Sequence, residues 1–214
     1  MKFGIVTDSS CDLPESYTMK EDVTVVSFYV SFDGENYLKE GKEAGITEFY
    51  QKMADKFLPL VKQGLPVLCI CLTKNFSGSM QAAVSAKEEV EEEFPQAKTE
   101  VVNSQLVTAL QGLFVKEAVK LRNQDVDLET AVEALKKIRH TGQIFFTTKD
   151  LKYLEHGGRI GKAACLAGSM LNIKPILRFC DAELGSTELC RGNRSNDWCT
   201  YRPLSYGTGN FEKM

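Results

Sequence analysis

The strongest constraint on the fold is a repeated alternation of short apolar segments with longer amphipathic ones. Residues 2–7, 23–30 and 67–72 are short runs rich in Val and Ile, which is typical of buried strands. Between and after these runs, apolar residues recur at three- and four-residue steps, the spacing of amphipathic helices. Strands that alternate with helices in this way predict an α/β fold with a mostly parallel sheet and covering helices.

The remaining elements of the N-terminal part follow the same alternation. A short helix is expected after Pro14, because Asp12 and Glu15 have the spacing of a capping box. The other expected elements are four helices and a further strand. The helices cover residues 46–57, 78–94, 106–121 and 128–138, and the strand covers 100–102.

The pattern changes near residue 142. The elements expected after that point are a strand at 143–147, short helices at 149–154 and 162–170, and a hairpin from 173–177 and 183–190. No helical or strand period holds from 193 to 214. We therefore expect two domains, an N-terminal α/β domain over residues 1–141 and a smaller C-terminal α/β domain over residues 142–214.

The composition excludes several classes of protein. Of the 214 residues, 43% are hydrophobic and 26% are charged, which is ordinary for globular proteins and excludes collagenous and low-complexity chains. The net charge of −3 lacks the broad positive footprint of a nucleic-acid-binding protein. No segment approaches eighteen uninterrupted apolar residues, so we expect a soluble cytoplasmic protein with no more than transient membrane contact.

The cysteine pattern indicates a reducing compartment. There are seven cysteines, an odd number, and most lie in apolar runs as small buried side chains do. Cys69 and Cys71 are two residues apart on an expected strand, so both should point to one face. There is no CxxC pair and there are only two histidines, so we expect no metal site.

Polar turns follow two of the expected strands. Asp8, Ser9 and Ser10 follow the first strand, and Ser77-Gly78-Ser79 follows the run 67–72; Ser104 lies in a third turn. In an open parallel sheet, ligands bind outside the carboxyl ends of the strands, where the strand order switches. Ser77-Gly78-Ser79 also opens a helix, whose N–H groups and dipole favour an anion. A cap role for Ser77 and a turn role for Asp8 are equally compatible with the pattern.

The usual catalytic motifs do not occur in the chain. It contains no GxxxxGK[ST], GxSxG or HExxH pattern, so we predict neither a nucleoside triphosphate site nor a catalytic residue. His140 closes a helix and His156 lies in a loop, and both fit structural or surface positions better than catalytic ones.

Several segments together resemble the DegV family, from residue 2 to about residue 192. They are Thr7–Pro14, Leu72–Ala83, Asn103-Ser104 and Leu151–Leu177, in that order along the chain. The resemblance implies two α/β domains with a long-chain fatty acid between them and no other cofactor. It also implies a carrier subunit of bacterial fatty acid kinase, which is not itself an enzyme. A separate kinase subunit would transfer phosphate from ATP to the bound carboxylate.

The resemblance also implies roles for individual residues. Ser77, Gly78 and Ser79 would bind the carboxylate, Arg191 would lie near it, and Arg159 would face the kinase. The residues expected behind the carboxylate site are Asp8, Ser9, Ser10 and Ser104. The apolar residues that could line an acyl tunnel, or equally form plain core, are Leu166, Met170, Leu171, Ile173 and Ile176. Acyl length, unsaturation and oligomeric state stay open.

The chain also departs from the family pattern. A Thr/Ser-Ser-x-Pro segment is absent after Lys56, and a histidine-containing segment is absent near the C-terminus, where Gly207-Thr208-Gly209 is the nearest trace. We therefore expect residues of the family pattern to be missing after Lys56 and after Gly192, which leaves the second domain incomplete. The alternative function is a phosphotransferase or hydrolase acting on a small phosphorylated metabolite. The turns offer Asp8 for it, but no paired base or metal cluster.

Overall fold

The computed structural model describes residues 2–31, 37–39, 42–43, 48–148, 151–161, 173–180 and 182–191. The chain forms two compact units. The first unit comprises Met1–Gln143 with Cys180–Ala182, and the second comprises Ile144–Phe179 with Glu183–Met214.

The first unit is built on a parallel four-stranded sheet in the order β2-β1-β6-β7. Its strands are β1 (Gly4–Asp8), β2 (Val23–Val26), β6 (Val67–Cys71) and β7 (Thr99–Asn103). Every residue of β1 and β6 is buried, as expected for strands covered on both faces. The predicted parallel sheet is confirmed.

The prediction of one strand over residues 23–30 was wrong, because β2 ends at Val26. After it, the backbone N–H of Phe28 donates to the hydroxyl of Ser9 at 2.9 Å, and the next strand belongs to another sheet. That sheet is antiparallel, with β3 (Tyr29–Ser31), β4 (Tyr37–Lys39) and β5 (Lys42–Glu43) in sequence order.

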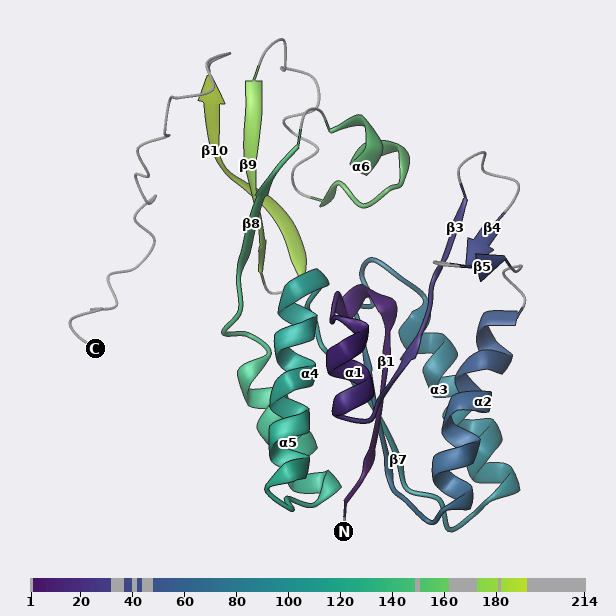
Figure 1. Ribbon diagram of the computed structural model, residues 1–214. Coiled ribbons are helices and arrows are strands. Elements are labelled where there is room, and N and C mark those ends of the chain that lie inside the picture. The colour runs from purple at the N-terminus through teal and green to yellow at the C-terminus, as the bar shows by residue number, and fades with distance from the viewer. Residues whose placement is uncertain are drawn as a thin grey trace, which may run out of the picture. The chain divides into compact units, whose positions relative to one another are not determined.

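The helices cover the parallel sheet on both faces (Figure 1). On one side lie α1 (Glu15–Lys20), α4 (Thr108–Asn123) and α5 (Leu128–Ile138), and on the other lie α2 (Glu48–Lys62) and α3 (Ser79–Glu93). The predicted capping box does not form. Asp12 adopts a left-handed conformation with φ 49°, and α1 begins only after Pro14.

Two apolar cores lie on the two faces of the sheet, because successive side chains of a strand point to opposite faces. Ile5 packs with residues of α4 and α5, whereas Val6 packs with residues of α2 and α3. Cys69 and Cys71 share the second core, with their Sγ atoms 3.8 Å apart, which confirms that both point to one face. The hydrogen bond from Cys69, together with burial, holds the pKa of the Cys71 thiol well above its usual range.

Helix α2 includes the position after Lys56 at which the Thr/Ser-Ser-x-Pro segment of the family pattern is absent. Lys56 lies inside this 15-residue helix, which also contains Pro59 and ends at Lys62. Its buried residues Met53 and Phe57 belong to the second core. The chain therefore continues as helix after Lys56.

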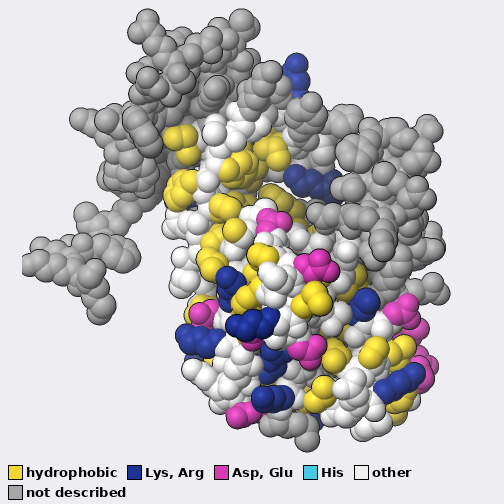
Figure 2. Space-filling model, viewed as in Figure 1, with side chains coloured by type: hydrophobic (Ala, Val, Ile, Leu, Met, Phe, Trp, Pro, Cys, Tyr) yellow, Lys and Arg dark blue, Asp and Glu magenta, His cyan; other side chains and the backbone are white. Residues whose placement is uncertain are grey.

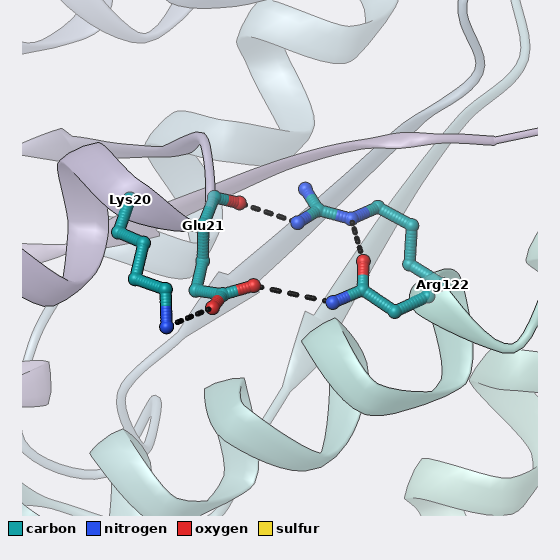
Figure 3. A network of polar contacts seen from close by, with 4 residues as sticks. Lys20, Glu21 and Arg122 are labelled. Atoms are coloured by element: carbon teal, nitrogen blue, oxygen red, sulfur yellow. Dashed lines mark hydrogen bonds and ion pairs between the residues drawn. The ribbon is translucent and has the colours of Figure 1, made fainter.

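Arg122 ties α4 to the end of α1 (Figure 3). This arginine is only 8% exposed, and its guanidinium donates to the backbone carbonyls of Glu21 and Asp22. The Glu21 carboxylate in turn accepts from Asn123 at 3.1 Å and lies 3.7 Å from the ammonium group of Lys20. The network satisfies carbonyls at a helix C-terminus, which is a structural task.

The second unit contains an antiparallel sheet in the order β10-β9-β8. Its strands are β8 (Ile144–Thr147), β9 (Ile173–Cys180) and β10 (Glu183–Arg191), and α6 spans Lys152–His156. The predicted hairpin is confirmed, since β9 and β10 are neighbours in this sheet. The expected helix at 162–170 and residues 193–214 lie outside the described residues.

The described surface of the first unit mixes charges of both signs. Figure 2 shows Lys and Arg side chains interspersed with Asp and Glu side chains over this face. Such a distribution is typical of a solvated surface. Among the helices that the structure describes, none has the length and apolar character needed to cross a bilayer.

Candidate functional site

The site lies where the strand order of the parallel sheet switches. From β1 the chain passes to β2 on one side, while β6 flanks β1 on the other, so the switch point falls between β1 and β6. Asp8 is the last residue of β1, and Leu72 directly follows β6. Asp8 Oδ2 accepts from the backbone N–H of Leu72 at 2.9 Å. The carboxyl group of Asp8 therefore joins the two strand ends.

The Asp8 carboxyl group is fully buried and accepts four hydrogen bonds. Oδ1 accepts from the backbone N–H of Ser10 at 3.3 Å and from Gln111 Nε2 at 2.9 Å. Oδ2 accepts from Leu72 and from the hydroxyl of Ser79 at 3.3 Å. Burial raises the pKa of Asp8, and this effect exceeds the lowering by the donors. None of the ion pairs formed by the described residues includes Asp8.

The turn Ser77-Gly78-Ser79 opens α3, but its two serines differ in environment. Ser79 is 2% exposed and its hydroxyl donates to Asp8, so it points into the protein. Ser77 is partly exposed, and its hydroxyl oxygen accepts from the backbone N–H of Ser79 at 3.1 Å. Within the part of the chain that the structure describes, no hydrogen bond uses the Ser77 hydroxyl as donor. Gly78 is exposed, with no atom within 4 Å of the position that a Cβ would take.

The other serines expected near the site lie around the same strand ends. The Ser10 hydroxyl donates to Gln111 Oε1, so Ser10 belongs with Asp8 and Ser79. Ser9 instead accepts from the backbone of Phe28. Ser104 is fully buried and accepts from Leu106 N at 3.1 Å, so it fixes its own turn.

Gln111 is the residue that sequence reasoning missed. It lies on α4, is fully buried, and donates from Nε2 to both Asp8 Oδ1 and Thr7 Oγ1, the latter at 3.2 Å. The available signal was an amide at the start of a helix side that is mostly apolar as far as Val119. Gln111 shares the buried side of α4 with Phe114, Val115 and Ala118.

The two arginines singled out by sequence lie toward the C-terminal part of the chain. Arg191 is the last residue of β10, and its side chain lies outside the described part. Arg159 is exposed in the second unit, and its Nη1 donates to the carbonyl of Gly157. The adjacent Gly158 has φ +68°, a conformation that suits glycine.

The geometry favours binding of an anion over catalysis. The start of α3 presents main-chain N–H groups and the positive end of a helix dipole beside the Ser77 hydroxyl. Four donors occupy the Asp8 oxygens, so Asp8 is poorly placed to act as a general base. Among the described residues, no cluster of three His, Cys, Asp or Glu side chains could hold a metal ion.

Comparison with known sequences gives one family and several relatives. The family model described as "Uncharacterised protein, DegV family" matches residues 2–196. A DegV domain-containing protein of Listeria monocytogenes is 32% identical over 201 residues, which are 86% of this chain and 69% of the relative. The DegV domain-containing protein YteA of Lactococcus lactis is 34% identical over 194 residues, 83% of this chain and 67% of the relative.

Comparison with solved structures gives the same picture. A stearic-acid-binding protein from Eubacterium ventriosum is 36% identical, with a TM-score of 0.81 over 89% of this chain and 71% of that protein. A fatty-acid-binding DegV family protein from Thermus thermophilus is 27% identical, with a TM-score of 0.77 over 90% and 72% of the two chains. Both matches agree with the α/β architecture described above.

Proposed function

Because the chain belongs to the DegV family, we propose that it binds a long-chain fatty acid and carries out no chemistry of its own. The observation that carries this proposal is the similarity to the stearic-acid-binding protein, at 36% identity and a TM-score of 0.81. The bound fatty acid is then the ligand, and no further cofactor is required.

The start of α3 is the proposed site for the fatty-acid carboxylate. Ser77 would donate its hydroxyl hydrogen to the carboxylate, and Gly78 would allow close approach because it has no Cβ. Ser79 would take part through its position, since its hydroxyl donates to Asp8 and its backbone N–H donates to Ser77. Arg191 is the proposed cationic partner, because a guanidinium pairs with a carboxylate through two hydrogen bonds.

The proposed role in the cell is to present the carboxylate to a partner kinase. That kinase would transfer the terminal phosphate of ATP to a carboxylate oxygen, forming an acyl phosphate and ADP. Arg159 is the proposed docking residue on this chain. Its exposure and the neighbouring turn at Gly158 support the proposal, because an exposed guanidinium can pair with acidic groups of a partner.

Ser77→Ala is expected to weaken fatty-acid binding by about tenfold while the protein stays folded. A hydrogen bond to a charged group contributes roughly 1.5–3 kcal/mol. The expected cap role of Ser77 was wrong, because the N-cap residue of α3 is Gly78. The Ser77 hydroxyl still accepts from Ser79 N within the turn, and loss of that hydrogen bond costs about 1 kcal/mol of stability. Displacement of a fluorescent fatty acid measures the affinity, and urea unfolding measures the stability.

Ser85→Ala is the matched control, because Ser85 is exposed on the same helix. It should leave the affinity unchanged. If Ser77→Ala bound fatty acid as tightly as the wild type, Ser77 would only stabilise the turn before α3 and would not be a carboxylate ligand.

Arg159→Ala is expected to leave fatty-acid affinity and thermal stability near wild type while acyl phosphate formation by the kinase falls. The loss should be largest at low salt, where an exposed charge is least screened. Lys120→Ala removes one exposed positive charge from the first unit and serves as control. Equal rates for Arg159→Ala and wild type at low salt would rule out a docking role for this residue.

A further inference from the structure

We propose that Gln111 is a positioning residue that holds the Ser77-Gly78-Ser79 turn in place for the fatty-acid carboxylate by acting through Asp8. This inference rests on the proposed function. It adds a residue of α4, far from the turn in sequence, to the determinants of affinity.

The Gln111 side chain is held in one orientation by its partners. Nε2 donates to Thr7 Oγ1 at 3.2 Å and to Asp8 Oδ1 at 2.9 Å, while Oε1 accepts from the Ser10 hydroxyl. Thr7 donates its own hydroxyl hydrogen to the carbonyl of Ile70 at 2.9 Å, so toward Gln111 it can only accept. A flipped amide would place its oxygen against two acceptors. The contacts therefore fix which end of the amide faces Asp8.

The fixed amide in turn fixes the Asp8 carboxyl group. Gln111 and the Ser10 main chain occupy Oδ1, which leaves Oδ2 for Leu72 N and the Ser79 hydroxyl. Rotation of the carboxyl group would break contacts on both oxygens at once. Ser79 is thereby held at the start of α3.

The position of Ser79 in turn restricts the position of Ser77. The backbone N–H of Ser79 donates to Ser77 Oγ at 3.1 Å, so the orientation of the Ser77 hydroxyl depends on where Ser79 lies. A continuous series of hydrogen bonds thus runs from Gln111 through Asp8 and Ser79 to Ser77. Its last member is the residue proposed to donate to the ligand.

Packing alone does not account for an amide at position 111. The side chain is fully buried on the side of α4 that Phe114, Val115 and Ala118 share, where a Leu or Met would bury well. Burial of an amide is favourable only when its polar atoms are paired, so its contribution lies in the contacts it makes. Those contacts lead to the proposed ligand site.

Gln111→Met tests the proposal, because it keeps the shape of the side chain and removes the amide. We expect fatty-acid affinity to fall by about tenfold, the effect of one lost hydrogen bond, measured by displacement of a fluorescent fatty acid. Val119→Ala is the control. Val119 lies in the same helix and core but outside the hydrogen-bond series, so this variant should lose stability and keep its affinity.

A double-mutant cycle with Ser79→Ala separates positioning from a general loss of stability. Once the Ser79 hydroxyl is gone, the link to Asp8 is broken, so adding Gln111→Met should change the affinity by less than about twofold. Should Gln111→Met fail to fold, Gln111→Asn replaces it. Asn keeps a buried amide but is one methylene group shorter, so it cannot hold the same contacts to Ser10 and Asp8, and the same loss of affinity is expected.

The outcomes distinguish this inference from the function on which it rests. Wild type that binds fatty acid, with Gln111→Met or Gln111→Asn binding equally well, would overturn the positioning role alone. Fully additive effects in the cycle would also overturn it. Wild type that binds no fatty acid would overturn both the proposed function and this inference.

Discussion

Gly112→Ala is expected to lower the free energy of unfolding by about 3 kcal/mol, at the upper end for an overpacked core. A Cβ at Gly112 would lie 2.3 Å from the backbone carbonyl oxygen of Cys11 and 3.2 Å from a methyl carbon of Leu13. The carbonyl belongs to the short helix η1 (Ser9–Cys11). This helix cannot shift away easily, because Ser10 is hydrogen-bonded to Asp8 and Gln111. Urea unfolding followed by circular dichroism measures the change.

Gly78→Ala is the matched control for this variant. Gly78 has φ −78°, and no atom lies within 4 Å of the Cβ position, so the cost should stay near about 0.5 kcal/mol. If Gly112→Ala unfolded at the same urea concentration as the wild type, the close approach of α4 to η1 would be contradicted.

Asp8→Asn is expected to lower the free energy of unfolding at neutral pH by about 1–3 kcal/mol, the cost of an unsatisfied buried group. Each oxygen of Asp8 faces a donor, Leu72 N on one side and Gln111 Nε2 on the other. Asn has one oxygen, so one of these donors must face the amide nitrogen. Because the contact to Ser79 is also disturbed, fatty-acid affinity should fall with stability. The stability loss is measured by urea unfolding.

The difference in free energy of unfolding between Asp8→Asn and the wild type should depend on pH. Burial raises the pKa of Asp8. At a pH between the unfolded and native pKa values, Asp8 is therefore protonated in the native protein but ionised in the unfolded chain. The stabilisation from that proton is fully present below the unfolded value near 3.8 and is lost as pH rises through the native value. Asn does not titrate, so the variant does not lose stability in this way. The amount by which its free energy of unfolding falls below that of the wild type should therefore shrink from about pH 4 upward. Unfolding curves that keep a constant difference over this range would contradict the burial effect.

The sequence pattern was sufficient for the sheet and its helices, because both are set by local periodicity. The parallel strands β1, β6 and β7 and the helices α3 to α5 appear where apolar spacing predicted them, within two residues at their ends. Helix α2 was also predicted, but it continues to Lys62 instead of ending at residue 57. The run at 23–30 was different. Its β-branched residues favour one long strand, but the partner strand β1 ends at Asp8, opposite Val26, and the N–H of Phe28 then donates to the Ser9 hydroxyl. That contact joins residues 19 positions apart, beyond the reach of local patterns.

The details of the site were harder to predict for the same reason. The polar turns at Asp8 and at Ser77-Gly78-Ser79 were recognised because each follows an apolar strand. The burial of Ser79, in contrast to the partly exposed Ser77, goes with its contact to Asp8, which is 71 residues away in sequence. Gln111 is 103 residues from Asp8, and only the packing of α4 against the sheet brings the two together. The roles of Arg191 and Arg159 stay predictions.

Native mass spectrometry of the purified protein tests fatty-acid binding most directly. The sample is measured as purified and again after removal of lipid and incubation with stearate, and then under denaturing conditions to release any ligand. We expect bound species heavier than the free chain by the masses of fatty acids that differ in two-carbon units or in unsaturation. Only the free chain in both samples, or a small phosphorylated metabolite in place of a fatty acid, would contradict the account, and the latter would favour a phosphotransferase or hydrolase.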